Sequence, residues 1–120
     1  MPVQTKPFED CLSGSWLAAR ISVEPVLLDV MRRAGELLAV RRPGSTEWLY
    51  PAWQYDGRTP RRVIQRIINV ARDAGMDEMR VYEVLTAPMG LGGQRRLADL
   101  IVEGRDEEVV QAVRSAAVVG

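Results

Sequence analysis

The stretch from Ser13 to Arg58 constrains the fold of this chain more than any other. It contains two short helical patterns around a tight turn, then two extended apolar runs separated by a Pro-Gly turn. An aromatic-rich exit follows at residues 48–55. This order predicts a helix, a turn, a second helix and then a two-stranded hairpin, which together form a known supersecondary unit.

Capping residues define the two predicted helices. Ser13 or Ser15 is suited to cap a first helix through residues 16–20. Ser22 is suited to cap a second helix over residues 24–34, where Pro25 occupies the first turn. Gly35 supplies the left-handed residue that ends this helix. The hairpin is expected to pair residues 37–42 with residues 47–50 across the turn at residues 43–46.

From Thr59 onward the apolar spacing becomes helical. Thr59 is expected to cap a helix that Pro60 opens, with a buried stripe at Val63, Ile64, Ile67, Ile68 and Ala71. Three more helices are predicted after Asp77, at residues 94–103 and after Asp106. The predicted fold is mostly α with one β-hairpin. An extended arm (1–12) precedes a winged helix-turn-helix-like part (13–58), which packs on a helical unit of about four helices (59–120).

The composition argues against catalysis. The chain has no His, and its single Cys therefore has no imidazole partner to form a nucleophilic dyad. The Asp and Glu residues are scattered through caps and exposed helix faces without metal-ligand spacing. We therefore expect no catalytic residues, no metal and no cofactor.

The cysteine content, the absence of long apolar runs and the net charge restrict the cellular location and the classes of binding partner that we expect. No signal peptide and no apolar run of membrane-spanning length is found, and one cysteine excludes an internal disulfide, so we expect a cytoplasmic protein without membrane contact. Lys plus Arg equals Asp plus Glu, at 16 each. This balance counts against tight non-specific binding to nucleic acid.

The 13–55 segment resembles the small DNA-binding modules of MerR and excisionase type. The resemblance rests on the Ile21-Ser22-Val23 turn, the helix end Arg32-Arg33-Ala34-Gly35-Glu36-Leu37-Leu38 and the exit Tyr50-Pro51-Ala52-Trp53-Gln54-Tyr55-Asp56. It implies a winged helix-turn-helix that binds double-stranded DNA as a homodimer on two half-sites. The arginines placed to contact a duplex are Arg32, Arg33, Arg41 and Arg42.

The back half resembles the toxin-binding domain of antitoxins of the Xre/MbcA/ParS type. The residues that carry the resemblance are 85–100, a Pro/Gly-rich loop leading into a helix, followed by Glu103-Gly104-Arg105-Asp106-Glu107-Glu108-Val109. It implies a protein partner, commonly a toxin of the NAD-degrading RES type. The residues predicted to contact that partner are Met89, Leu91, Arg95, Arg96, Val109 and Val113.

Three features leave alternatives open. The second helix carries Val26, Leu27, Val30 and Met31, which cannot read the donor–acceptor pattern of base edges, so it either packs on the back half or forms a protein interface. Arg41 and Arg42 either contact phosphates or decorate a solvated hairpin tip. Met89 and Leu91 either insert into a partner or pack into the core.

The sequence therefore predicts a small non-catalytic regulator. It would bind DNA through its N-terminal part and a protein partner through its C-terminal helices. The alternative is a pure protein-interaction or homodimerisation module whose helix-turn-helix no longer binds DNA.

Overall fold

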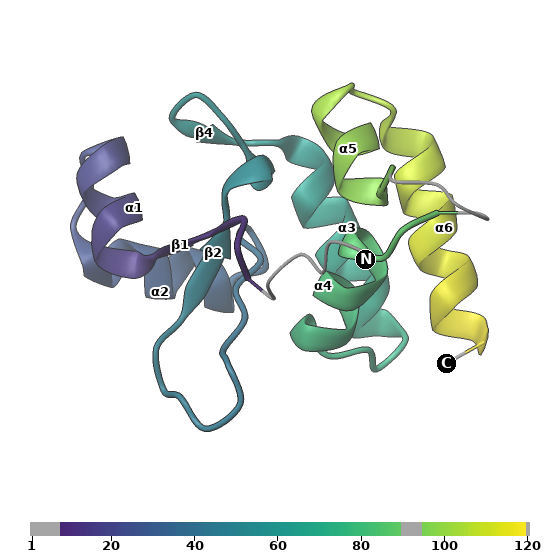
Figure 1. Ribbon diagram of the computed structural model, residues 1–120, viewed down its shortest axis with the longest axis horizontal. Helices are drawn as coiled ribbons and strands as arrows, with labels where there is room; N and C mark the ends of the chain where they lie inside the picture. The colour runs from purple at the N-terminus through teal and green to yellow at the C-terminus, as the bar shows by residue number, and fades with distance from the viewer. Residues whose placement is uncertain (1–7, 90–94, 120) are drawn as a thin grey trace, which may run out of the picture.

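The computed structural model describes residues 8–89 and 95–119. Within them the chain is mostly helical, with six α-helices and two small antiparallel two-stranded sheets. In chain order the elements are β1 (Cys11–Ser13), α1 (Gly14–Ile21), α2 (Pro25–Arg33), β2 (Leu49–Pro51), the 3-10 helix η1 (Ala52–Gln54), β3 (Tyr55–Asp56), β4 (Thr59–Pro60), α3 (Arg62–Asp73), α4 (Glu78–Thr86), α5 (Leu97–Val102) and α6 (Asp106–Val119). Figure 1 shows α1 and α2 at one end, the short strands in the middle and α3 to α6 at the other end. The predicted fold class is confirmed.

The helix-turn-helix forms where the sequence predicts it, but one cap differs. The Ser13 hydroxyl accepts a hydrogen bond from the Trp16 N–H at 3.3 Å and caps α1. Ser22 does not cap α2; it is left-handed (φ 60°) and ends α1, because Val23 N–H donates back to the Ala18 carbonyl. Pro25 occupies the first turn of α2 as expected.

The predicted hairpin of residues 37–42 and 47–50 is mostly absent. Val40 and Leu49 form a single antiparallel bridge, and β2 pairs with β1 instead, with Leu12 opposite Tyr50. The physical reason lies at Leu38, whose backbone is paired with a side chain. Its N–H donates to Gln54 Oε1 at 2.7 Å, and Gln54 Nε2 donates to its carbonyl at 2.8 Å. No neighbouring strand is needed where a buried amide satisfies both backbone groups.

The segment Leu37–Val40 divides two hydrophobic clusters. Leu37 and Ala39 belong to the smaller one, which we call the front cluster, together with Leu17, Ala18, Ile21, Leu28 and Tyr50. Leu38 and Val40 point to the other side and belong to the larger back cluster. That cluster also holds Leu49, Trp53 and the buried residues of α3 to α6. The two-residue period of an extended chain thus gives each cluster one face of the same segment.

The C-terminal helices follow the predicted stripes. The apolar positions predicted on α3 are all buried, and α3 packs against α6. Asp77 caps α4 by accepting from the Arg80 N–H at 2.8 Å. The sequence predicts that Thr59 and Pro60 start α3, but this prediction is wrong. The two residues form β4 instead and pair with β3 across Gly57, whose φ is 64°.

Candidate nucleic-acid interface

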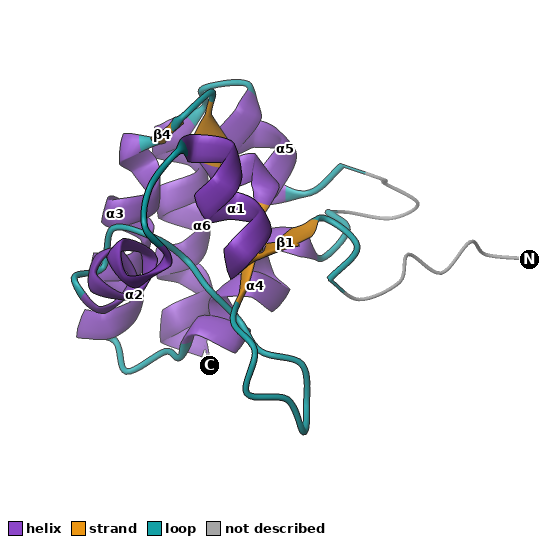
Figure 2. Cartoon of the chain, turned by 90° about the vertical axis from the view of Figure 1, so that its left-hand side faces the viewer, coloured by secondary structure: helices purple, strands orange, loops and turns teal. Residues whose placement is uncertain are grey.

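The loop of residues 41–48, here called the wing, projects from the body of the molecule (Figures 1 and 2). It connects Val40 and Leu49 at their single bridge, so its two ends are held together while its tip is exposed. This is the position that the predicted hairpin tip was expected to take.

Trp48 at the base of the wing is covered by two arginines. The guanidinium carbon of Arg32 lies 4.0 Å from the centroid of the Trp48 ring, and that of Arg41 lies 4.5 Å from it. Both distances are within cation–π range. The Arg32 side chain is only 15% exposed and also pairs with Asp29 at 3.5 Å. Arg32 therefore joins α2 to the wing, and little of its side chain is left for a partner.

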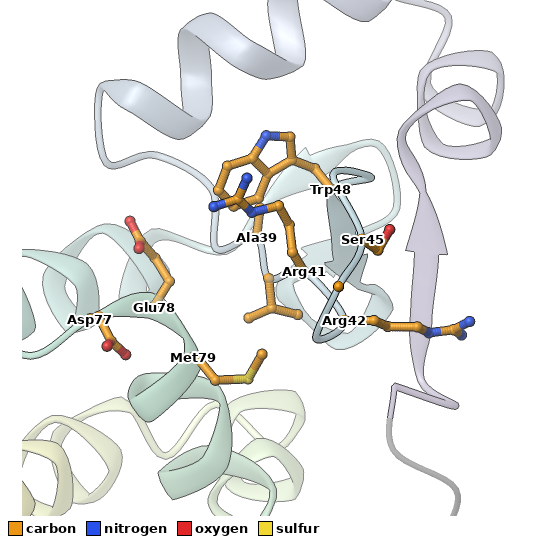
Figure 3. A pocket seen from close by; sticks show the side chains of 10 residues that line it. Ala39, Arg41, Arg42, Ser45, Trp48, Asp77, Glu78 and Met79 are labelled. Atoms are coloured by element: carbon orange, nitrogen blue, oxygen red, sulfur yellow. The ribbon is translucent and has the colours of Figure 1, made fainter.

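Arg41 and Arg42 lie on opposite sides of the wing. Figure 3 shows the Arg41 guanidinium over the Trp48 ring and Arg42 pointing away from the pocket. The Arg42 guanidinium carbon lies 5.9 Å from the Phe8 ring, which itself stacks on Tyr82 at 5.4 Å. Both arginines are exposed, and neither forms an ion pair with any described residue.

A shallow pocket of about 430 Å³ separates the wing from the start of α4. Arg41 and Trp48 line one side, and Asp77, Glu78 and Met79 line the other (Figure 3). The two carboxylates oppose the approach of a phosphate into the pocket. A phosphate contact with Arg41 must therefore come from the solvent side of its guanidinium, outside the pocket.

Helix α2 presents an apolar surface where a DNA-reading helix presents polar side chains. Val26 is 67% exposed, Leu27 41% and Val30 56%, while Leu28 on the opposite side is buried in the front cluster. Arg33, at the end of the helix, is exposed. Because Val26 and Val30 are exposed, this face of α2 does not pack on the C-terminal helices, which was one of the two alternatives left open by the sequence.

Arg72 of α3 holds the end of α2. Its two terminal nitrogens donate to the backbone carbonyls of Arg33 at 3.2 Å and Arg32 at 3.1 Å. A cation at this position adds donors to the last carbonyls of the helix and complements the helix dipole. Gly35 lies so close that an added Cβ would be 2.9 Å from the Arg72 guanidinium. Sequence analysis did not identify this contact, because nothing local indicates which carbonyls an exposed arginine will meet.

The predicted partner-binding residues do not form one surface. Val109 and Val113 have no exposed surface and pack in the back cluster, since the i, i+4 stripe of α6 faces α3. Met89 is half-buried against the same cluster. Arg95 is exposed and forms an ion pair with Glu103. Leu91 lies outside the described residues.

Arg96 belongs to a half-buried polar network around Asp10. The Asp10 carboxylate accepts hydrogen bonds from the Trp53 indole at 2.6 Å, from the Tyr82 hydroxyl at 2.6 Å and from Arg96 at 3.3 Å. Burial, and next the Asp10 carboxylate, raise the pKa of the neighbouring Cys11 thiol to about 12. Burial and the bond to Asp10 also raise the pKa of Tyr82 well above its usual value. The network joins the residue before β1 to η1, to α4 and to the N-cap of α5. Sequence analysis missed it because its members are up to 86 residues apart.

Among residues 8–89 and 95–119, no group of three or more His, Cys, Asp or Glu side chains is placed to hold a metal ion. None of the helices described there is both long and apolar enough to cross a membrane.

No protein-family model matches the sequence, and no curated protein matches it. Among solved structures, the fold is similar to the NMR structure of Rv2175c. The two chains are 18% identical, the comparison covers 98% of this chain and 86% of that one, and the TM-score is 0.80. Similarity at this level of identity establishes a common fold and no more.

Proposed function

We propose that this protein is a small, non-catalytic DNA-binding protein that contacts the duplex through its wing. The observation that carries the proposal is the exposed Arg41-Arg42 pair on a loop that projects beside a helix-turn-helix. Guanidinium groups without ion-pair partners are suited to phosphate oxygens, and a phosphate contact supplies affinity without sequence readout.

The wing is a better candidate for this contact than α2. Val26 and Val30 offer no donor or acceptor to a base edge, and Arg32 is occupied by Trp48 and Asp29. Arg33 is exposed at the end of α2 but is not part of the wing, and we place the phosphate contacts on the wing alone. The balanced total charge supports weak rather than tight non-specific binding.

Fluorescence anisotropy with labelled random and promoter duplexes tests the wing. Binding should weaken as salt rises, with a log–log slope of about −0.9 per neutralised phosphate. The double substitution Arg41→Ala/Arg42→Ala should reduce that slope by roughly 2 per protomer. The matched control, Arg80→Ala/Arg114→Ala on the C-terminal helices, removes the same charge and should leave the slope unchanged. No binding at low salt would exclude the proposal.

The exposed apolar face of α2 favours a second candidate, a protein-interaction module that does not use DNA. Failure to bind any duplex at low salt would support this candidate over the first.

A toxin partner on the C-terminal helices is a further part of the proposal and rests on the antitoxin resemblance. Two exposed side chains there are Arg95, which is one of the predicted contacts, and Val102, which is 53% exposed on α5. Co-purification with the product of an adjacent toxin-like gene, and its loss on Val102→Glu with Arg95→Glu, would support it. Unchanged co-purification of the double variant would place the contact elsewhere.

A further inference from the structure

The exposed large apolar side chains of the described residues are concentrated on the helix-turn-helix. Of the six that are more than 40% exposed, Trp16 is on α1, three are on α2, and only Val102 and Val118 lie elsewhere. Helix α2 has nine residues and buries one of them, Leu28. A monomer seldom leaves so much apolar surface on one short helix, and such a face marks a contact site.

The apolar residues of α2 form a continuous strip. Val26, Val30 and Arg33 follow the i, i+4, i+7 spacing of one helical face, and Leu27 lies at its edge. Arg32 is two residues from Val30, which is about 200° around the helix axis. Since Arg32 faces Trp48, the strip is turned away from the wing. The two surfaces can therefore be occupied at the same time.

The charges at the ends of α2 indicate what covers the strip. Glu24 precedes the helix and is exposed, and Arg33 ends it and is exposed. The sequence of acid, apolar centre and base is complementary to itself when two copies of the helix run antiparallel. A two-fold axis makes the same patch serve both subunits, as an isologous interface requires.

We propose that α2 is a homodimer interface in which two copies of the helix pack antiparallel. Val26 of each protomer packs on Val30 of the partner subunit, and Arg33 reaches Glu24 of the partner subunit. The inference deepens the protein-interaction candidate by naming its occupant, and it rests on that surface rather than on DNA binding. Because the wing is turned away, a dimer carries two wings on one particle.

Sedimentation velocity of the full chain across a range of micromolar concentrations tests the interface. The native protein should dimerise, and Val30→Glu or Val26→Glu should raise the dimer dissociation constant by at least about 100-fold, because each buries two unpaired carboxylates. Val118→Glu, at an 88% exposed valine of α6, is the matched control and should dimerise normally. Circular dichroism checks that each variant is folded. A native chain that stays monomeric, or folded Val26 and Val30 variants that dimerise like it, would overturn the proposal.

Charge reversal tests the antiparallel arrangement. Glu24→Arg and Arg33→Glu should each weaken the dimer by about tenfold, and the double variant should recover most of the loss. A double variant weaker than either single one would overturn the antiparallel pairing. The wing variant Arg41→Ala/Arg42→Ala should remain dimeric. The dimer and the DNA contact can thus fail independently and be told apart.

Discussion

The helices around the two hydrophobic clusters differ in how much apolar surface they leave exposed to solvent. The helices of the back cluster bury their apolar stripes and carry ion pairs outside, such as Arg66 with Glu107 at 2.7 Å. The front cluster is small, and its helices leave Trp16, Val26 and Val30 in solvent. A surface helix that packs on a core usually carries polar residues on the face turned to solvent, so an apolar outer face is not explained by packing within this chain. The difference shows that the back half buries its apolar residues, whereas the front half leaves an apolar surface exposed.

The clusters are separate but not independent. Neighbouring residues of Leu37–Val40 alternate between them, and in β2 Leu49 belongs to the back cluster while Tyr50 belongs to the front. Arg72 adds a link from α3 to the end of α2. A destabilising substitution in either cluster should therefore lower the stability of the whole chain.

The largest expected effect on stability comes from a cavity-creating substitution in each hydrophobic cluster. Ile67→Ala in the back cluster and Leu28→Ala in the front cluster should each lower the free energy of unfolding by about 2–5 kcal/mol, since both residues are 1% exposed. Urea unfolding followed by tryptophan fluorescence should show one transition for both variants. Val102→Ala, at an exposed position, should stay within about 0.5 kcal/mol of the native protein. Two separate transitions would show that the clusters unfold independently.

Gln54 provides a sharper test of the link between the clusters. Gln54→Leu removes both partners of the Leu38 backbone and leaves a buried N–H and a buried carbonyl unpaired. We expect a loss of about 2–4 kcal/mol in urea unfolding and faster hydrogen exchange at the Leu38 amide. Gln65→Leu on the exposed side of α3 is the control. Native stability in the Gln54 variant would mean that other groups satisfy this backbone.

Helices were more predictable than pairing. The stripe on α3, the Asp77 cap and Pro25 in α2 all depend on residues near one another in sequence, and the structure confirms them. The hairpin was wrong because Leu37–Val40 is apolar at every position. Such a run predicts an extended, fully buried segment but does not reveal its partner. Leu38, within the run, pairs with the side chain of Gln54, a residue type that is usually exposed.

The candidate site was less predictable than the fold. The Arg41-Arg42 pair and the apolar face of α2 are visible in the sequence, because one is a local motif and the other a helical spacing. The contact of Arg32 with Trp48, and the Asp10 network, join residues that are distant in sequence. Val109 and Val113 were assigned to a partner, although their i, i+4 spacing also indicates the buried side of a helix.

The smallest effects come from two tyrosines, Tyr82 in the back cluster and Tyr55 beside the front cluster. The Tyr82 hydroxyl donates to Asp10, so Tyr82→Phe should cost about 1–2 kcal/mol of unfolding free energy at neutral pH. The Tyr55 hydroxyl is buried with no partner among the described residues, so Tyr55→Phe should be neutral or slightly stabilising.

The stability contributed by Tyr55 should depend on pH. Burial raises the pKa of Tyr55 to about 12 from 10.0, so the folded state resists its ionisation. Its contribution to stability is fully present below pH 10 and is lost as the pH rises toward 12. Tyr55→Phe should therefore flatten the alkaline loss of stability in urea unfolding series from neutral pH to this range. An alkaline slope equal to that of the native protein would mean that the Tyr55 hydroxyl reaches solvent, and that the front cluster is more open than its packing indicates.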